Sequence, residues 1–209
     1  MTIIRTGLIT DGSSDRALIP LITLLLKEHL QLPYDSIEHI TCDTNVLSEK
    51  VSEVANTYSL DILFIHRDAE NTEWTNRISE ITNATPSNLM GKVIAVIPVK
   101  MTESWLLTDA KVIRNAVGNP TSTTNLEIPV ASKLETCAAK TVLLNALTAA
   151  SDLGTQRRRK FKPEKFRHRV AELTTDLGLL RNIPSFKRLE DDLKPLLLQL
   201  NLNRIVASC

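Results

Sequence analysis

One stretch decides the expected fold of this chain: Ile62-Leu63-Phe64-Ile65-His66-Arg67-Asp68-Ala69-Glu70. Four apolar residues in a row indicate a strand that is buried on both faces, as strands of parallel sheets are. The strand runs directly into Asp68 and Glu70, two carboxylates separated by one residue. The sequence therefore predicts a buried strand that ends at a pair of acids.

Strands and helices alternate on both sides of this stretch. We expect strands at residues 3–9, 37–42, 60–65 and 92–99. We expect helices at residues 15–30, 45–58 and 73–82, and one that begins near Thr102. Ser13 or Ser14 is expected to cap the first helix, and Asp15 to complement its dipole. The alternation predicts an α/β fold, with a parallel sheet flanked by helices.

The second half of the chain has helical patterns alone. A polar loop is expected at residues 118–129, followed by helices at 135–151, 163–176 and 185–200. Because no second sheet is indicated, we expect residues 1–117 to form the α/β domain. Residues 118–209 are then a C-terminal helical extension packed on it.

The composition excludes several classes of protein. With 43% hydrophobic and 23% charged residues, disorder is not expected, and 4% aromatic residues argue against a stacking platform for nucleic acid. Three widely spaced cysteines indicate reduced thiols rather than a disulfide framework or a zinc site. No secretory signal is evident, and the longest apolar run is too short to span a bilayer. We therefore expect a cytoplasmic protein without a membrane partner.

The net charge of +1 conceals an asymmetry. Residues 157–169 contain eight Lys or Arg and one Glu, a net charge of +7, which leaves −6 for the rest of the chain. Such a segment can follow a phosphate backbone, although a solvated basic helix end has the same composition. The candidate nucleic-acid-binding residues in this run are Arg157, Arg158, Arg159, Lys160 and Lys162.

Acids follow three of the four expected strands. Asp11 follows the first strand, Asp68 and Glu70 follow the third, and Glu103 follows the fourth. In an open parallel sheet the ligand crevice lies at the carboxyl ends of the strands, so these side chains are expected at one edge. Four carboxylates there would repel one another unless a cation lay among them. An all-oxygen ligand set suits Mg²⁺ or Mn²⁺ rather than zinc.

Each piece of this pattern also has an ordinary explanation. Asp11-Gly12-Ser13 can be a strand-to-helix turn, Asp68 can begin a polar loop, and Glu103 can serve a helix dipole. A core or surface role for His66 is favoured over proton transfer. The sequence lacks dinucleotide-binding, P-loop, zinc-peptidase and serine-hydrolase motifs. The agreement of three strand ends favours the metal site.

At these positions the sequence resembles the Toprim domain, the metal-dependent fold of topoisomerases, primases and OLD-type nucleases. That family has Glu-Gly after its first strand and Asp-x-Asp after a later one, where this chain has Asp11-Gly12 and Asp68-Ala69-Glu70. A bacterial Toprim-like group also carries the motif E-x-W-x-L-x-D, which is matched by Glu103, Trp105, Leu107 and Asp109. The stretch Ser185-Phe186-Lys187-Arg188-Leu189 resembles the C-terminal S-F-x-x-L element of that group.

The resemblance implies a Mg²⁺- or Mn²⁺-dependent nuclease. Asp68 and Glu70 would hold the metal, and Glu103 would complete or orient its ligand shell. Asp11 would be a further ligand or the general base. Asp11 stands where the family has Glu, and Glu70 where it has Asp. The exchange either preserves the cage or marks a site without activity.

The resemblance also implies partners. Arg67 and Lys100 would contact phosphate oxygens of a nucleic acid. A partner ATPase and an effector role in antiviral defence are expected from proteins of this kind. The alternative is a non-catalytic Toprim-like subunit that binds an ATPase or nucleic acid. A hydrolase of small phosphate compounds is a third interpretation, in which the basic segment is merely solvated.

Overall fold

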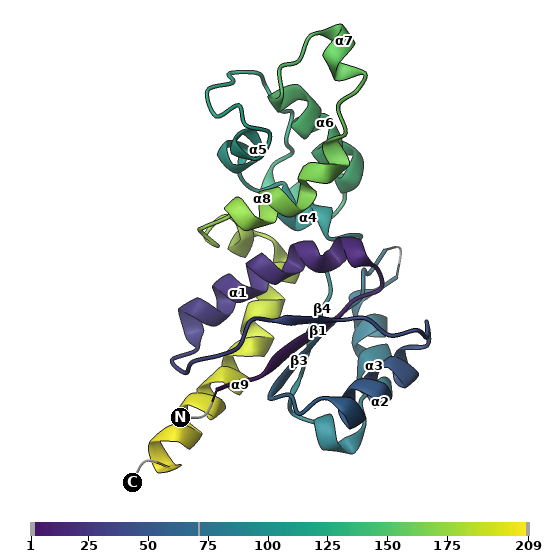
Figure 1. Cartoon of the computed structure of the whole chain (residues 1–209), viewed down its shortest axis with the longest axis vertical. Coiled ribbons are helices and arrows are strands. Elements are labelled where there is room, and N and C mark those ends of the chain that lie inside the picture. The colour runs from purple at the N-terminus through teal and green to yellow at the C-terminus, as the bar shows by residue number, and fades with distance from the viewer. Residues whose placement is uncertain (1–2, 71, 208–209) are drawn as a thin grey trace.

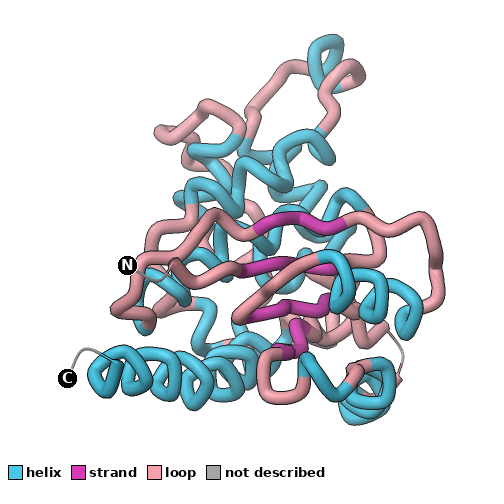
Figure 2. The backbone as a smooth tube through the Cα atoms, turned by 60° about the horizontal axis from the view of Figure 1, so that its bottom comes forward, coloured by secondary structure: helices cyan, strands magenta, loops and turns pink. Residues whose placement is uncertain are grey.

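The computed structural model describes residues 3–70 and 72–207, and these residues form a four-stranded sheet. Its strands are β1 (Thr6–Ile9), β2 (Glu38–Ile40), β3 (Ile62–His66) and β4 (Val93–Val96). All neighbours pair in parallel, in the order β2-β1-β3-β4, so the predicted parallel sheet is confirmed. The chain moves from β1 to one edge and later from β3 to the other, which creates a topological switch between β1 and β3 (Figure 2).

Helices cover both faces of the sheet, which explains the apolar run of β3. Figure 1 shows α1 (Leu18–His29) and α9 (Pro184–Ala207) on one side of the strands, with α2 (Leu47–Thr57) and α3 (Trp74–Ala84) on the other. Phe64 belongs to the core that contains α1 and α9, whereas Leu63 and Ile65 belong to the core that contains α2 and α3. Every residue of β3 is buried because both faces are covered.

The remaining helices gather at one end of the sheet-bearing part, and α9 returns along the sheet (Figure 1). They are α4 (Glu103–Leu106), α5 (Ala110–Ala116), α6 (Ala139–Ala150), α7 (Thr155–Arg158) and α8 (Arg167–Leu173). Leu143 in α6 and Phe186 in α9 share one continuous core with Phe64. The division expected between residues 117 and 118 stays a prediction. Among the helices that the structure describes, none is both long enough and apolar enough to cross a membrane.

The start of α1 differs from the prediction. Ser13–Ala17 forms a 3-10 helix, and α1 begins at Leu18 after Ala17, so neither serine caps it and that prediction was wrong. The hydroxyl of Ser14 lies instead 3.4 Å from Oδ1 of Asp15. Asp15 lies in the first turn of this 3-10 helix and is buried, with 8% exposure.

The helix that was expected near Thr102 is short, and a second helix follows it. One turn, α4, is succeeded by α5, whose N-cap is Asp109. The carboxylate of Asp109 accepts a hydrogen bond from the backbone N–H of Lys111 at 2.7 Å. The last acid of the E-x-W-x-L-x-D motif therefore has a structural role as a helix cap. The single turn of α7 was also not expected.

Candidate active site

The candidate active site lies at the carboxyl ends of β1, β3 and β4. Backbone hydrogen bonds continue past the last two strands: the N–H of Ala69 donates to Pro98 O at 3.0 Å, and that of Glu70 to Lys100 O at 3.2 Å. The segment after β4 therefore runs beside the segment after β3. Acidic side chains from three strand ends consequently lie at one edge of the sheet, next to the topological switch.

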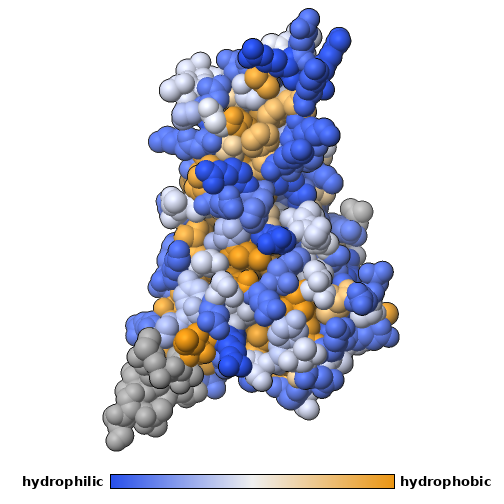
Figure 3. All heavy atoms as spheres, in the orientation of Figure 1, coloured by the Kyte–Doolittle hydropathy of each residue, from blue (hydrophilic) through white to orange (hydrophobic). Residues whose placement is uncertain are grey.

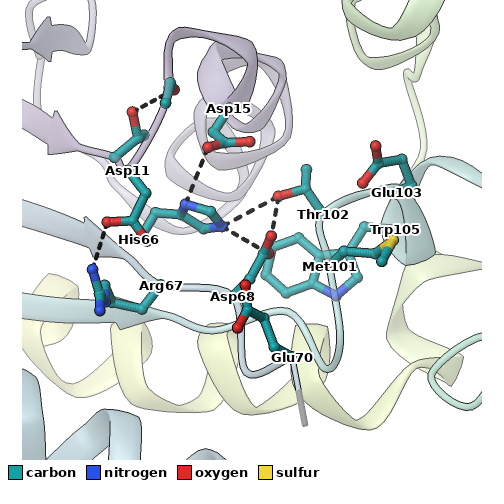
Figure 4. Close-up of polar contacts among 12 residues, drawn as sticks. Asp11, Asp15, His66, Arg67, Asp68, Glu70, Met101, Thr102, Glu103 and Trp105 are labelled. Carbon is teal, nitrogen blue, oxygen red and sulfur yellow. Dashed lines mark hydrogen bonds and ion pairs between the residues drawn. The ribbon is translucent and has the colours of Figure 1, made fainter. Parts of the chain in front are cut away.

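His66 is the buried centre of this edge, with 1% of its surface exposed (Figure 4). Its Nε2 lies 3.1 Å from Oδ1 of Asp68 and 3.2 Å from the hydroxyl of Thr102. On the other side of the ring, Nδ1 lies 3.7 Å from Oδ2 of Asp15 and has no hydrogen-bond partner among the described residues. The ring therefore separates two carboxylates, and only Asp68 is held at hydrogen-bond distance.

Asp11 is held by an arginine at the surface. Nη1 of Arg67 donates to Oδ1 of Asp11 at 2.6 Å, and Nη2 of the same guanidinium lies 2.8 Å from Glu80. The side chain of Asp11 is 45% exposed, so this predicted ligand sits at the rim of the site. Arg67, predicted to contact phosphate, is engaged by two carboxylates here.

Glu70 and Lys100 both have left-handed backbone conformations, with φ of 53° and 63°. Such conformations strain residues other than glycine, and they are common near functional sites. The Glu70 side chain is 71% exposed, and Arg77 is 3.9 Å from it. Nζ of Lys100 donates to the backbone carbonyl of Thr136 at 2.6 Å, which ties this loop to the helical part. These two predicted site residues therefore lie in the loops that border the site.

Glu103 is almost fully buried and is paired with the basic segment. Its Oε1 lies 3.0 Å from Nη2 of Arg167, the first residue of α8, and its exposure is 4%. Because Arg167 belongs to the run of positive charge at residues 157–169, the fold joins this run to the acidic strand ends. We call Asp11, Asp15, His66, Arg67, Asp68, Glu103 and Arg167 the acid edge.

Trp105 fixes the turn that carries Glu103. Its indole N–H donates to the hydroxyl of Ser185 at 2.8 Å, and its ring packs edge-on against Phe186 with centroids 5.2 Å apart. The backbone N–H of Ser185 donates in turn to Glu135 at 2.9 Å. The two motifs that were quoted separately from the sequence thus meet in the core, where they anchor α4 to α9.

The first part of the basic run lies away from the acid edge. Arg157, Arg158, Arg159, Lys160 and Lys162 are exposed and lie in α7 or just after it. Figure 1 shows α7 at the far end of the helical part, and Figure 3 shows hydrophilic side chains gathered there. The structure therefore does not bring these five predicted residues beside the acids.

The acid edge fits a hard divalent ion in the type of its donors, which are carboxylate oxygens. Within the described part of the chain, however, no three of the predicted acids bring ligand atoms within 4.8 Å of one another. Asp11 and Glu103 are each held by an arginine, and Asp68 by His66. An ion that takes Asp11 and Glu103 as ligands would displace Arg67 and Arg167 from them.

A second cluster does bring three potential ligands together, and we call it the Glu190 cluster. Glu28, His29 and Glu190 have ligand atoms within 4.8 Å of one another. Arg181 donates to both oxygens of Glu190, at 2.9 and 2.8 Å, and also binds Glu28. The Arg181 hydrogen bonds, with a smaller contribution from His29, lower the pKa of Glu190 to about 2. The position that a metal would need is filled by a guanidinium, so this cluster is an ion-pair network between α1 and α9.

Sequence reasoning did not assign to the site three residues that lie at it, Asp15, His66 and Thr102. Asp15 was assigned to a helix dipole, His66 to the core or surface, and Thr102 only to the start of a helix. Nothing local in the sequence indicates that Arg167 pairs with Glu103, 64 residues earlier.

Comparison with known proteins gives one distant structural match. No protein-family model matches the chain, and no curated protein matches its sequence. The structure is similar to the C-terminal region of the Burkholderia pseudomallei OLD protein, with a TM-score of 0.42 and 14% identity. The match covers 91% of this chain and 98% of that one.

Proposed function

We propose that this chain is a Mg²⁺- or Mn²⁺-dependent nuclease that hydrolyses phosphodiester bonds of nucleic acid. The observation that carries the proposal is the ion pair between Glu103 and Arg167. It joins the acids at the strand ends to the one strongly basic segment of the chain. A phosphodiester needs both, because acids bind the divalent cation and basic groups neutralise the phosphate.

The carboxylates would have different roles in metal binding, according to their exposure and their partners. Asp68 and Glu103 would hold the ion, together with Glu70 and Asp11 once the arginine at the rim is released. A bound Mg²⁺ or Mn²⁺ would supply Lewis-acid stabilisation of the charge that develops on the phosphate. His66 and Thr102 would keep the Asp68 carboxylate in one orientation. Nε2 of His66 lies 3.1 Å from Oδ1 of Asp68, and the hydroxyl of Thr102 lies 3.5 Å from the same oxygen.

Arginines that pair with the acids in this structure would change partner when substrate binds. The guanidinium of Arg167 matches a phosphate as well as it matches a carboxylate, because both accept two parallel hydrogen bonds. Arg67 would do the same at the rim. Asp11 would then be available as a further ligand or as the general base.

The proposal is tested with Asp68→Asn and Glu103→Gln in the full chain. Both substitutions remove a negative charge and keep the shape of the side chain. We expect each to abolish Mg²⁺- or Mn²⁺-dependent cleavage of a labelled oligonucleotide, while the circular dichroism spectrum stays unchanged. Glu53→Gln, an exposed acid of α2, is the matched control and should cleave normally. Cleavage that persists in both site variants would overturn the proposal.

A second candidate is a non-catalytic subunit that docks on an ATPase or on nucleic acid. It is favoured by the pairing of Asp11 with Arg67 and of Glu103 with Arg167, which neutralises two acids without a metal. A thermal melt distinguishes the candidates, because an ion that binds the folded state raises the midpoint by mass action. No shift with Mg²⁺ or Mn²⁺, together with no cleavage, would select the subunit. An ATPase partner and a role in antiviral defence are proposed from the motif resemblance alone.

A further inference from the structure

A pocket of about 400 Å³ lies next to the acid edge, on the side of the helical part. One wall is the 3-10 helix Ser13–Ala17, and the other is the segment 164–168 at the start of α8. Arg167 lines this pocket and also binds Glu103, so the pocket and the acid edge share one guanidinium. Ser14 and Arg16 in the first wall flank Asp15, the acid that faces His66.

The lining of the pocket carries more positive than negative charge. Arg16 and Lys165 are exposed, and neither makes an ion pair with any residue that the structure describes. Nε of Arg167 is buried and has no hydrogen-bond partner in the described ranges. The acid in the lining is Glu164, while His168 lies 3.3 Å from Glu172 outside it. Two exposed cations without an ion-pair partner, on opposite walls of one hollow, indicate an anionic ligand.

The ligand must be small, and it must reach the acid edge. The volume falls within the range of pockets that hold small ligands, and it suits one nucleotide rather than a duplex. The hydroxyls of Ser13 and Ser14 add donors that suit phosphate oxygens. A strand whose scissile phosphate lay at Asp68 and Glu103 could place a neighbouring nucleotide here, because Arg167 borders both spaces.

We propose that this pocket binds the phosphate of a nucleotide adjacent to the bond that is cleaved. The inference rests on the proposed nuclease function, and it names the substrate more closely: a single polynucleotide strand, held by Arg16 from one wall and Lys165 from the other. An anion between these residues links two segments about 150 positions apart in the chain. The bound strand therefore holds the basic segment against the sheet-bearing part.

The test measures binding without catalysis. The full chain is titrated in EDTA against a fluorescein-labelled 12-nucleotide single strand, and anisotropy is recorded. Arg16→Ala and Lys165→Ala should each weaken binding about 10-fold and flatten its salt dependence, since each removes a phosphate contact. Glu164→Gln should tighten binding, because it removes the opposing charge. Lys187→Ala, an exposed lysine of α9, is the equal-charge control and should change the affinity less than 2-fold.

The outcomes distinguish a failure of the pocket proposal from a failure of the nuclease proposal. If Arg16→Ala and Lys165→Ala bind as the control does, the pocket proposal is wrong, whatever Asp68→Asn does to cleavage. If both bind weakly but the unaltered chain cleaves nothing, the pocket stands as a phosphate site and the nuclease proposal fails. Strands with a 5′-phosphate and a 5′-hydroxyl identify the source of the phosphate. A preference for the 5′-phosphate that Arg16→Ala removes assigns a terminal phosphate, and equal affinity assigns an internal one.

Discussion

The acid edge and the Glu190 cluster contain the same kinds of residue, and they differ in how well these are satisfied. In the Glu190 cluster, Arg181 and His29 both bind Glu190. At the acid edge three buried nitrogens lack a hydrogen-bond partner: His66 Nδ1, Arg67 Nε and Arg167 Nε. In the described part of the chain, the fourth such atom is Nε of Arg114. Buried polar atoms normally have hydrogen-bond partners. Three unpaired nitrogens at the acid edge therefore indicate a binding site rather than a purely structural ion pair.

The tightest group of potential metal ligands and the proposed active site therefore lie in different places. Three ligand atoms come closest together in the Glu190 cluster because a guanidinium holds them there. The acids of the acid edge are held separately, Asp11 by Arg67, Asp68 by His66 and Glu103 by Arg167. A tight acidic group can therefore be a structural ion pair, while a looser one with unsatisfied neighbours has the character of a binding site.

The largest effect is expected on activity at Asp15. Asp15→Asn removes the carboxylate that faces the unpartnered nitrogen of His66, and we expect cleavage to fall about 100-fold or more. The free energy of unfolding should not decrease, because Asp15 makes no hydrogen bond shorter than 3.4 Å with a described side chain. Cleavage assays and urea unfolding measure the two quantities, with the exposed Asp43→Asn as control. A marked loss of stability with normal cleavage would show that Asp15 has a structural role and not a functional one.

The opposite pattern is expected for Glu190. Glu190→Gln should lower the free energy of unfolding by about 3 kcal/mol, because it leaves Arg181 and His29 without their shared carboxylate. Cleavage at a temperature well below the melting point should be unchanged. Urea denaturation of the variant beside the unaltered chain measures the loss. A variant as stable as the unaltered chain would show that the cluster is not a structural pair.

The same residue predicts how stability depends on pH. The pKa of Glu190 falls to about 2 on folding, from an ordinary value of 4.5. The folded state then binds fewer protons than the unfolded state, so the stabilisation is complete above pH 4.5 and is lost as the pH falls toward 2. The difference in urea midpoint between the unaltered chain and Glu190→Gln should be full at pH 7 and narrower at pH 3. An equal difference at both pH values would contradict this assignment.

A smaller effect is expected at Trp105. Trp105→Phe keeps an aromatic ring against Phe186 but removes the indole N–H that binds Ser185, which should cost about 1 kcal/mol of stability. Combining it with Ser185→Ala forms a double-mutant cycle, in which the two losses should not add. Full additivity would mean that the hydrogen bond contributes nothing.

Local pattern was sufficient for the four strands and for the edge at which the acids lie. The apolar run of β3 predicted burial on both faces, and the acids after three strands predicted a common edge, because parallel strands end together. Local pattern failed at the start of α1, where a 3-10 helix replaced the expected serine cap. The choice between the two kinds of turn depended on burial against His66, which no window of a few residues contains.

The sequence by itself determined the parallel α/β sheet, the strand-end acids and the presence of one basic segment, since periodicity and charge are local properties. Only the tertiary structure decided which cations meet which acids. Arg167 reaches Glu103 and Arg67 binds Asp11, whereas the basic residues Arg157, Arg158, Arg159, Lys160 and Lys162 lie elsewhere. Electrostatic pairing depends on distance in space, which the order of β1 and β3 sets for Arg67 and the packing of α8 sets for Arg167.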